Sequence, residues 1–396
     1  MTIRYQEGIA WMESVSLEKL AQVVGTPAYC YSSQTLLDRA RAWKEAFRSY
    51  PTLSCFAVKA NACPKILELL SREGLGADVV SGGELELALS HGFPAEKILF
   101  SGVGKTRSEI KRALEKEILC LNVESAEELE EIVEVASALK KKAPIALRLN
   151  PDIDPHTHPH IATGLAHTKF GMDRETALKL VKRFHSNSHL EWKGIACHLG
   201  SQIVDLNPFR EAARQLVSLA QEFSNLGVKL RELDLGGGLG IRYEAEEPPK
   251  LSDYAKTLHD VLRPTHLRLL LEPGRILVAE AGILLTRVIR VKRTIGKTFV
   301  VVDAGMNDLL RPALYGAYHR IEAVREGAAK IKADVVGPIC ETTDTLGFER
   351  QLPDLKAGDL LMIREAGAYG ATMSSTYNAR PLTRQVWIEG KNWEST

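Results

Sequence analysis

The stretch ILCLNVESAEELEEIVEVASALKKKAPIALRLN (residues 118–150) decides the predicted fold. It opens on a β-type apolar run at 118–122, continues with charged residues at helical spacing over 124–142, and closes on a second apolar run at 145–150. Two such runs joined by an amphipathic helix are typical of neighbouring parallel strands with a helical crossover. The stretch therefore predicts a strand–helix–strand unit.

The same unit recurs outward in both directions. The β-type runs are LSCFAVK (53–59), ADVV (77–80), KILF (97–100), ILCLN (118–122), IALRLN (145–150), GIACHL (194–199), ELDLGG (232–237) and LRLLLEP (267–273). Strand and helix repeated eight times predict an α/β fold, a (β/α)8 barrel of the TIM type. A doubly wound open sheet is the alternative, which the count of eight and the length of the span disfavour.

After residue 281 the rhythm changes to closely spaced apolar runs. They are GILLTRVIRVKRT (282–294), TFVVVDAG (298–305), KADVVG (332–337), DLLMIREAG (359–367) and RQVWIEG (384–390). Runs this close together predict a mostly antiparallel β-domain. We therefore expect a barrel over 31–281 and a β-domain over 282–396, to which residues 1–30 add a strand or a helix.

Composition narrows the classes of partner. The chain has 396 residues, of which 45% are hydrophobic, and its 51 Lys and Arg almost balance its 50 Asp and Glu. A balanced chain without a basic block offers no footprint for nucleic acid or for an anionic membrane surface. No apolar run is long enough to span a bilayer, and the first residues lack a signal-peptide pattern. We expect a cytoplasmic protein that binds a small molecule.

The six cysteines are spread along the chain without a CxxC pair, so we expect free thiols. Acidic and histidine residues alternate in the irregular stretch 150–171, namely Asp152, Asp154, His156, His158 and His160. Interleaved prolines and the lack of a helical or hairpin frame argue against a metal site there, and we predict no metal. Cys197 and His198 are adjacent on a strand and point to opposite faces, which excludes a nucleophile pair.

Chemistry in a barrel of this type takes place where the strands end. Lys59 ends the first run, Asp78 lies in the second, and His198 and Glu272 lie near the ends of the sixth and eighth. A lysine at the end of an apolar strand is desolvated, which lowers its pKa as a Schiff-base lysine requires. A snorkelling or salt-bridged lysine is the alternative, and the lysine alone does not decide between them.

Two glycine-containing loops follow the last two strands. DLGGGLG (234–240) and EPGR (272–275) present backbone N–H groups and the Arg275 guanidinium where barrels bind phosphate. A flexible turn explains either loop alone, but together they favour a phosphate clamp. A lysine beside a phosphate clamp indicates pyridoxal phosphate, with Glu272 as the acid for the pyridine nitrogen. His198 is placed to stack on the ring, and a hydrogen-bonded core histidine is its alternative.

Ordered motifs extend this interpretation to a family. FAVKAN, DVVSGGEL, CHLGSQ, LDLGGGLGI, EPGR, DLLRPALYGAYH (308–319), GPICETTDTL (337–346) and EAGAYGATMSSTYNARP (365–381) closely resemble, in the same order, motifs of pyridoxal-phosphate enzymes of the alanine-racemase-type fold. Within that fold they are most similar to the diaminopimelate decarboxylases, part of the group IV decarboxylases. The resemblance covers nearly the whole chain.

The resemblance implies pyridoxal 5'-phosphate held by Lys59 as a Schiff base, with His198 on the ring and Glu272 on the pyridine nitrogen. Asp78 is counted among the cofactor-binding residues. The phosphate and the groups beside it would be held by Ser201, Gly237, Gly238, Gly274, Arg275 and Tyr369.

For the substrate the resemblance implies meso-2,6-diaminopimelate, decarboxylated to L-lysine and CO2 in lysine biosynthesis. Arg275, Arg311 and Tyr315 would surround the distal carboxylate, the one that does not react, and Tyr369 is counted among the substrate-binding residues. Two guanidinium groups suit that carboxylate, whereas ornithine and lysine carry none at that end. Arg311 is therefore the feature that separates these substrates.

The family works as a homodimer with shared active sites, so the resemblance implies a second chain in each site. Cys340 of the partner subunit would protonate the former α-carbon, and Glu341 of the partner subunit would accept the distal ammonium. A decarboxylase for another amino acid, or for a carrier-linked or polyamine precursor, is one alternative. A non-catalytic relative that binds a partner is another, which the retained Lys59, Glu272, Cys340 and both arginines disfavour.

Overall fold

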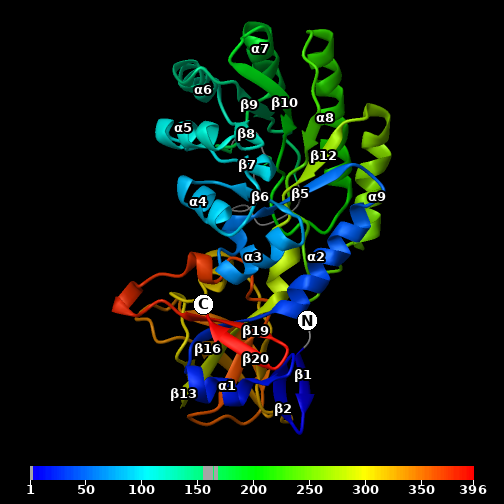
Figure 1. Cartoon of the computed structure of the whole chain (residues 1–396). Coiled ribbons are helices and arrows are strands. Elements are labelled where there is room, and N and C mark those ends of the chain that lie inside the picture. Colours follow the sequence, from blue (N-terminus) through cyan, green and yellow to red (C-terminus); the bar gives the residue numbers. More distant parts are fainter. Residues whose placement is uncertain (1–2, 155–163, 165–167) are drawn as a thin grey trace.

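The computed structural model describes residues 3–154, 164 and 168–396. Figure 1 shows a barrel surrounded by helices, with a β-rich part below it where both chain termini lie. Within the described residues, no helix is both long enough and apolar enough to cross a membrane.

The barrel is closed and parallel, as the eight predicted runs require. Its strands are β5 (Thr52–Ala57), β6 (Gly76–Val79), β7 (Ile98–Phe100), β8 (Cys120–Val123), β9 (Ala143–Arg148), β10 (Leu190–Ala196), β11 (Glu232–Asp234) and β12 (Arg268–Leu271), and β12 pairs with β5 to close the ring. The predicted (β/α)8 barrel is therefore confirmed.

Helices alternate with these strands on the outside of the barrel (Figure 1). They are α2 (Ser33–Phe47), which precedes β5, and α3 (Pro64–Arg72), α4 (Gly82–Ser90), α5 (Arg107–Lys116), α6 (Ala126–Leu139), α7 (Arg174–Phe184), α8 (Asn207–Asn225) and α9 (Leu251–Leu262). Side-chain caps fix several of their starts, because Ser81, Thr106 and Ser125 accept a backbone N–H in the first turn of α4, α5 and α6. These defined starts set the length of the loops that carry the site.

The β-rich part is mostly antiparallel, as predicted. One sheet contains β4 (Ala28–Ser32), β13 (Gly282–Thr294), β14 (Lys297–Val302), β15 (Ile321–Ala323), β16 (Ile331–Val336), β17 (Thr345–Leu352), β18 (Leu360–Ile363), β19 (Arg384–Glu389) and β20 (Asn392–Ser395). Only its β14–β16 and β4–β19 pairs are parallel. The N-terminal residues add β1 (Ile3–Gln6), β2 (Ile9–Met12), β3 (Val15–Ser16) and α1 (Leu17–Val24).

The strands end earlier than their apolar runs. The first run was expected to reach Lys59, but β5 ends at Ala57 and Lys59 lies in a short 3-10 turn, Val58–Ala60. The sixth run was expected to reach residue 199, but β10 ends at Ala196. The functional side chains therefore lie in the loops just beyond the strands, which lets them turn toward a common centre.

Candidate active site

The first loop of the barrel brings an ammonium to a buried carboxylate. Lys59 Nζ lies 3.3 Å from Asp78 Oδ2, and Asp78, on β6, is fully buried. Ala57, the last residue of β5, is the register partner of Asp78 on β6, so these two residues lie at the same level of the barrel. Lys59 follows Ala57 by two residues. Asp78 Oδ1 has no hydrogen-bond partner within the described residues.

The expected lowering of the Lys59 pKa is wrong. Desolvation lowers the pKa of this ammonium, but the carboxylates of Asp78 and Glu272 outweigh desolvation and hold the pKa above its ordinary value. The expectation failed because it considered burial alone. The two carboxylates come from distant parts of the sequence and meet Lys59 only in the folded barrel.

Acidic groups share the floor of the site. The Glu272 carboxylate, just beyond β12, lies near Ser101 Oγ at 3.4 Å and Asn122 Nδ2 at 3.5 Å. Asn122 also donates to Asp234, at 3.4 Å. Burial first, and then the neighbouring Asp78, raise the pKa of Asp234 to about 6 and that of Glu272 well above its ordinary value. These carboxyl groups therefore keep a proton to a higher pH than an isolated carboxyl group does.

His198 borders the same cavity and is oriented by the loop after β11. Its Nδ1 accepts the Gly237 N–H at 3.1 Å and lies 3.9 Å from Glu272 Oε2. Burial lowers the pKa of His198 well below its ordinary value, and the Lys59 and Arg148 cations add to that effect. The side chain is therefore a neutral ring.

The glycine loops approach other backbone too closely for any side chain. A Cβ on Gly237 would lie 2.2 Å from the Glu272 carbonyl oxygen, and a Cβ on Gly238 would lie 2.4 Å from the Gly200 carbonyl oxygen. Gly238 also has a φ of +104°, a conformation that L side chains rarely adopt. Glycine is thus required where these loops line the cavity.

A buried guanidinium lies beside the loops. Arg275 begins the short helix α10 (Arg275–Val278), and it donates to Tyr243 Oη at 2.7 Å and to Ser201 Oγ at 2.8 Å. Its Cζ lies 5.0 Å from the centroid of the Tyr369 ring. Its Nε–H has no partner within the described residues.

One cavity gathers most of the predicted cofactor residues. Its lining includes Lys59, His198, Ser201, Gly237, Gly238, Glu272, Gly274, Arg275 and Tyr369. Tyr369 reaches it from the loop after β18, where its backbone N–H donates to Ala60 at 2.8 Å. The β-rich part therefore contributes to a cavity formed mainly by the barrel.

The predicted substrate residues fall into two groups. Arg311 and Tyr315 lie on α11 (Arg311–Tyr315), and the Arg311 Cζ is 4.8 Å from the Tyr243 ring that also contacts Arg275. Cys340 and Glu341 are exposed and do not line the cavity of their own chain. The Glu341 carboxylate instead accepts the Tyr377 hydroxyl at 2.5 Å.

Several residues near this cavity had not been predicted. Ser101, Asn122 and Arg148 lie at or near the ends of the third, fourth and fifth strands. Their position at a strand end is the sequence signal that marks them. Tyr243 and His319 lie outside the strands and had no such signal. Of the rejected metal pattern, His156, His158 and His160 lie outside the described residues.

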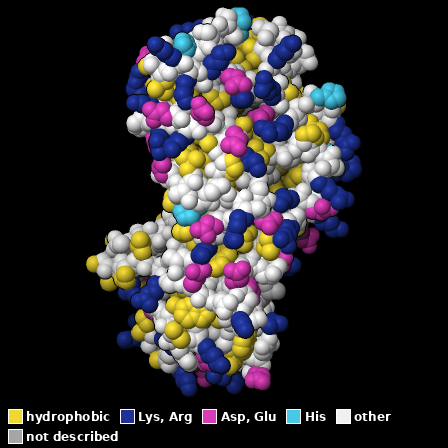
Figure 2. Space-filling view, viewed as in Figure 1, with side chains coloured by type: hydrophobic (Ala, Val, Ile, Leu, Met, Phe, Trp, Pro, Cys, Tyr) yellow, Lys and Arg dark blue, Asp and Glu magenta, His cyan; other side chains and the backbone are white. Residues whose placement is uncertain are grey.

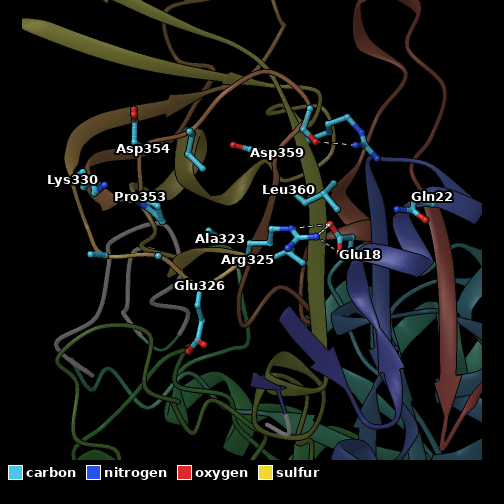
Figure 3. A pocket seen from close by; sticks show the side chains of 16 residues that line it. Glu18, Gln22, Ala323, Arg325, Glu326, Lys330, Pro353, Asp354, Asp359 and Leu360 are labelled. Atoms are coloured by element: carbon cyan, nitrogen blue, oxygen red, sulfur yellow. Dashed lines mark hydrogen bonds and ion pairs between the residues drawn. The ribbon is translucent and has the colours of Figure 1, made fainter. Parts of the chain in front are cut away.

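A second hollow, of about 360 Å³, lies in the β-rich part (Figure 3). Arg325 points at Glu18 there and donates to it at 2.9 Å, while Arg287 donates to the Gly358 carbonyl oxygen at 3.0 Å. The arginines of this hollow are thus already paired within the chain. The barrel cavity is the better candidate for chemistry.

Comparisons with known proteins agree with this geometry. A family model described as "Pyridoxal-dependent decarboxylase, pyridoxal binding domain" matches residues 33–279. The diaminopimelate decarboxylase of Aquifex aeolicus is 47% identical over 98% of this chain and 92% of its own length. That of Vibrio cholerae is 48% identical over 98% and 93%.

Solved structures give the same result. Diaminopimelate decarboxylase from Helicobacter pylori, complexed with L-lysine, superposes with a TM-score of 0.93 at 43% identity, covering 96% of this chain and 95% of that one. The enzyme from M. jannaschii, also with L-lysine, gives a TM-score of 0.95 at 37% identity, covering 100% and 94%.

Proposed function

The chain belongs to the diaminopimelate decarboxylase family, and we propose on that basis that its barrel cavity decarboxylates meso-2,6-diaminopimelate to L-lysine and CO2 with pyridoxal 5'-phosphate. The observation that carries the proposal is the cavity itself, in which Glu272 and Lys59, the latter paired with the buried Asp78, lie beside glycine loops and a buried guanidinium.

The residues of the cavity fit the cofactor. At Gly237 and Gly238 the loop after β11 approaches neighbouring backbone so closely that only glycine fits, and glycine loops of this kind are common phosphate sites. The buried Arg275 Nε–H and Asp78 Oδ1 lack partners within the described chain, so one donor and one acceptor remain for hydrogen bonds to a ligand. Gly237, Gly238, Gly274, Ser201 and Tyr369 would hold the phosphate and its neighbours.

Pyridoxal phosphate supplies an electron sink for the pair of electrons that the departing carboxylate leaves behind. Lys59, 3.3 Å from Asp78, would be the covalent anchor of the cofactor. Glu272 would be the acid for the pyridine nitrogen. His198, a neutral ring fixed by the Gly237 N–H, would pack against the cofactor ring.

The substrate assignment depends on Arg275 and Arg311. Both guanidinium groups are buried, and neither makes an ion pair with a carboxylate in the described part of the chain. Two buried cations without a counter-ion favour an anionic ligand, and the distal carboxylate of diaminopimelate is such a group. Tyr369 lines the cavity beside Arg275, and Tyr315 lies on the same short helix as Arg311.

CO2 release across a panel of amino acids tests the function. The holoenzyme should release CO2 from meso-diaminopimelate and form L-lysine, while L-lysine and L-ornithine should give at most traces. Faster turnover of ornithine, lysine or a carrier-linked amino acid would show that this compound, and not diaminopimelate, is the substrate. No turnover of any amino acid, with the cofactor bound, would favour a non-catalytic relative.

We propose further that the active enzyme is a homodimer with shared sites. The barrel over 31–281 supplies the cofactor residues other than Tyr369, and the β-domain, residues 1–30 and 282–396, supplies Cys340 and Glu341 to the other subunit. Support comes from the exposure of Cys340 outside its own cavity and from exposed apolar side chains in the same part of the chain, Tyr377 and Leu382. Figure 2 shows hydrophobic side chains on the protrusion at the left, where Figure 1 draws the segment after β18.

In the shared site, the C–C bond to the reacting carboxylate breaks, CO2 leaves, and a proton must reach the former α-carbon. The Cys340 thiol of the partner subunit supplies that proton, and the partner's Glu341 accepts the distal ammonium of the substrate. A site built from one chain alone would lack this acid.

Subunit mixing tests the shared site. Lys59→Ala chains and Cys340→Ala chains, each inactive alone, should regain activity when mixed, because each mixed dimer has one site with both residues intact. Random pairing makes half the dimers mixed, so the ceiling is roughly a quarter of wild-type activity.

The matched control mixes Lys59→Ala with Arg311→Ala, two residues that the proposal takes from one chain for the same site, and should restore nothing beyond the residual activity of Arg311→Ala. If verified subunit exchange brings no recovery in the first mixture, each chain builds its own site.

A further inference from the structure

His319 lies between α11 and β15 and contacts the guanidinium that we assign to the distal carboxylate. Its Nε2 is 2.7 Å from Arg311 Nη1, and its Nδ1 is 2.9 Å from the Arg364 carbonyl oxygen. The side chain is fully buried, and its ring meets the Tyr243 ring edge-on with the centroids 5.3 Å apart. His319 is thus held on both nitrogens.

These two contacts determine the protonation state of the ring. A carbonyl oxygen only accepts hydrogen bonds, so Nδ1 must carry the proton that is donated to Arg364. A guanidinium only donates, so Nε2 must be the unprotonated acceptor for Arg311. A single neutral tautomer satisfies both contacts, whereas an imidazolium would direct an N–H at the guanidinium.

We propose that His319 is a positioning residue for substrate specificity, which holds Arg311 in place for the distal carboxylate without neutralising its charge. The proposal rests on the proposed function. A carboxylate in the position of His319 would orient Arg311 equally well, but it would pair with the guanidinium and compete with the substrate.

The aromatic neighbour of both guanidinium groups, Tyr243, is a neutral group like His319. Tyr243 contacts both guanidinium groups through its ring and accepts from Arg275 through its hydroxyl, again as a neutral group. Arg311 and Arg275 are each only 6% exposed, so solvent contributes little to their orientation. The orientation of Arg311 therefore depends on neutral groups in the described part of the chain, and His319 makes a direct hydrogen bond to it.

Binding of two product-like ligands to the holoenzyme tests the proposal. L-Lysine retains the distal carboxylate, whereas cadaverine, the diamine left when that carboxylate is removed, does not. By calorimetry, His319→Phe should raise the Kd of L-lysine about 10-fold, the scale of one hydrogen bond to a charged group, and change the Kd of cadaverine by less than about 2-fold. The KM of diaminopimelate should rise while kcat changes by less than about 3-fold.

Two further variants separate positioning from general support of the fold. His259→Gln removes another buried histidine, which contacts Ser49 Oγ and does not line this cavity, and it should leave L-lysine binding unchanged. Adding His319→Phe to Arg311→Ala should not weaken L-lysine binding further, because the histidine acts through Arg311. If His319→Phe fails to fold, His319→Gln, whose amide oxygen replaces Nε2, takes its place in the same cycle.

The outcomes are distinct. Unchanged L-lysine binding in the folded His319 variant, or an equal loss for L-lysine and cadaverine, would overturn the role of His319 and leave the proposed function standing. An additive loss in the double variant would overturn it as well. A wild-type holoenzyme that does not bind L-lysine would instead overturn the proposed function.

Discussion

Replacing Arg311 with Ala removes one of the two cations at the carboxylate end of the cavity. Arg311 is buried, forms no ion pair with a described carboxylate, and is held by the neutral His319 and the Tyr243 ring. Its charge is therefore fully available to a ligand. Arg275 remains after the substitution, so the substrate carboxylate keeps one partner.

The size of the effect follows from that geometry. One hydrogen bond to a charged group contributes about 1.5–3 kcal/mol, and the upper part of that range applies because the contact is desolvated. A loss of about 2–3 kcal/mol corresponds to roughly a 30- to 150-fold fall in kcat/KM for meso-diaminopimelate. Cofactor binding should not change, because the glycine loops are untouched.

The assay is CO2 release with varied substrate, together with the absorbance of bound cofactor. Arg325→Ala is the matched control, since that arginine is paired with Glu18 in the hollow of the β-rich part and lies outside the barrel cavity. It should retain wild-type kcat/KM. If Arg311→Ala stays within about 2-fold of wild type, below ~0.5 kcal/mol, the assignment of the distal carboxylate to Arg311 is refuted.

Two other predictions address the anchor and the buried imidazole. Lys59→Ala should abolish covalent attachment of the cofactor and lower turnover by orders of magnitude, and mass spectrometry after borohydride reduction should find the wild-type adduct on Lys59 and on no other lysine. Burial and the Arg311 cation hold the pKa of His319 well below its ordinary value, so below about pH 6.5 the unfolded chain binds a proton at this ring and the folded chain does not. As the pH is lowered, the free energy of unfolding of wild type relative to His319→Gln should then fall by about 1.4 kcal/mol per pH unit. A constant difference from pH 7 to pH 5 in urea melts would contradict a neutral buried ring.

The sequence predicted the barrel well because a buried parallel strand and an amphipathic helix leave separate, regular patterns. Strand ends were less accurate, since an apolar run continues into the loop when the loop is also buried, as at Val58 and Ala60. Three strands of the β-rich part were not predicted. The side chains of β20 are exposed along its whole length, β15 has three residues, and β17 has polar residues in its middle.

The site was predictable where a residue follows a strand directly, and not where the chain must fold back. Tyr369 reaches the cavity with a φ of +55°, an uncommon conformation for a bulky residue that no sequence pattern indicates. The raised pKa of Lys59 depends on Glu272, more than two hundred residues later in the chain. Effects of this kind require coordinates, because they depend on distances between side chains rather than on spacing.

The charges of the cavity are divided between its two ends, and this division explains the preference for a diacid over a simple diamine. Around Lys59, three buried carboxyl groups outnumber the two cations, Lys59 and Arg148, and that end suits an amine and a pyridine nitrogen. Around Arg311, the two guanidinium groups contact hydroxyl, ring and imidazole groups among the described residues, and that end suits a carboxylate. Burying two cations without a counter-ion destabilises the folded chain unless a ligand supplies the anion. A substrate without the distal carboxylate would leave that destabilisation in place, so the residues that we assign to diaminopimelate would also disfavour lysine and ornithine as substrates.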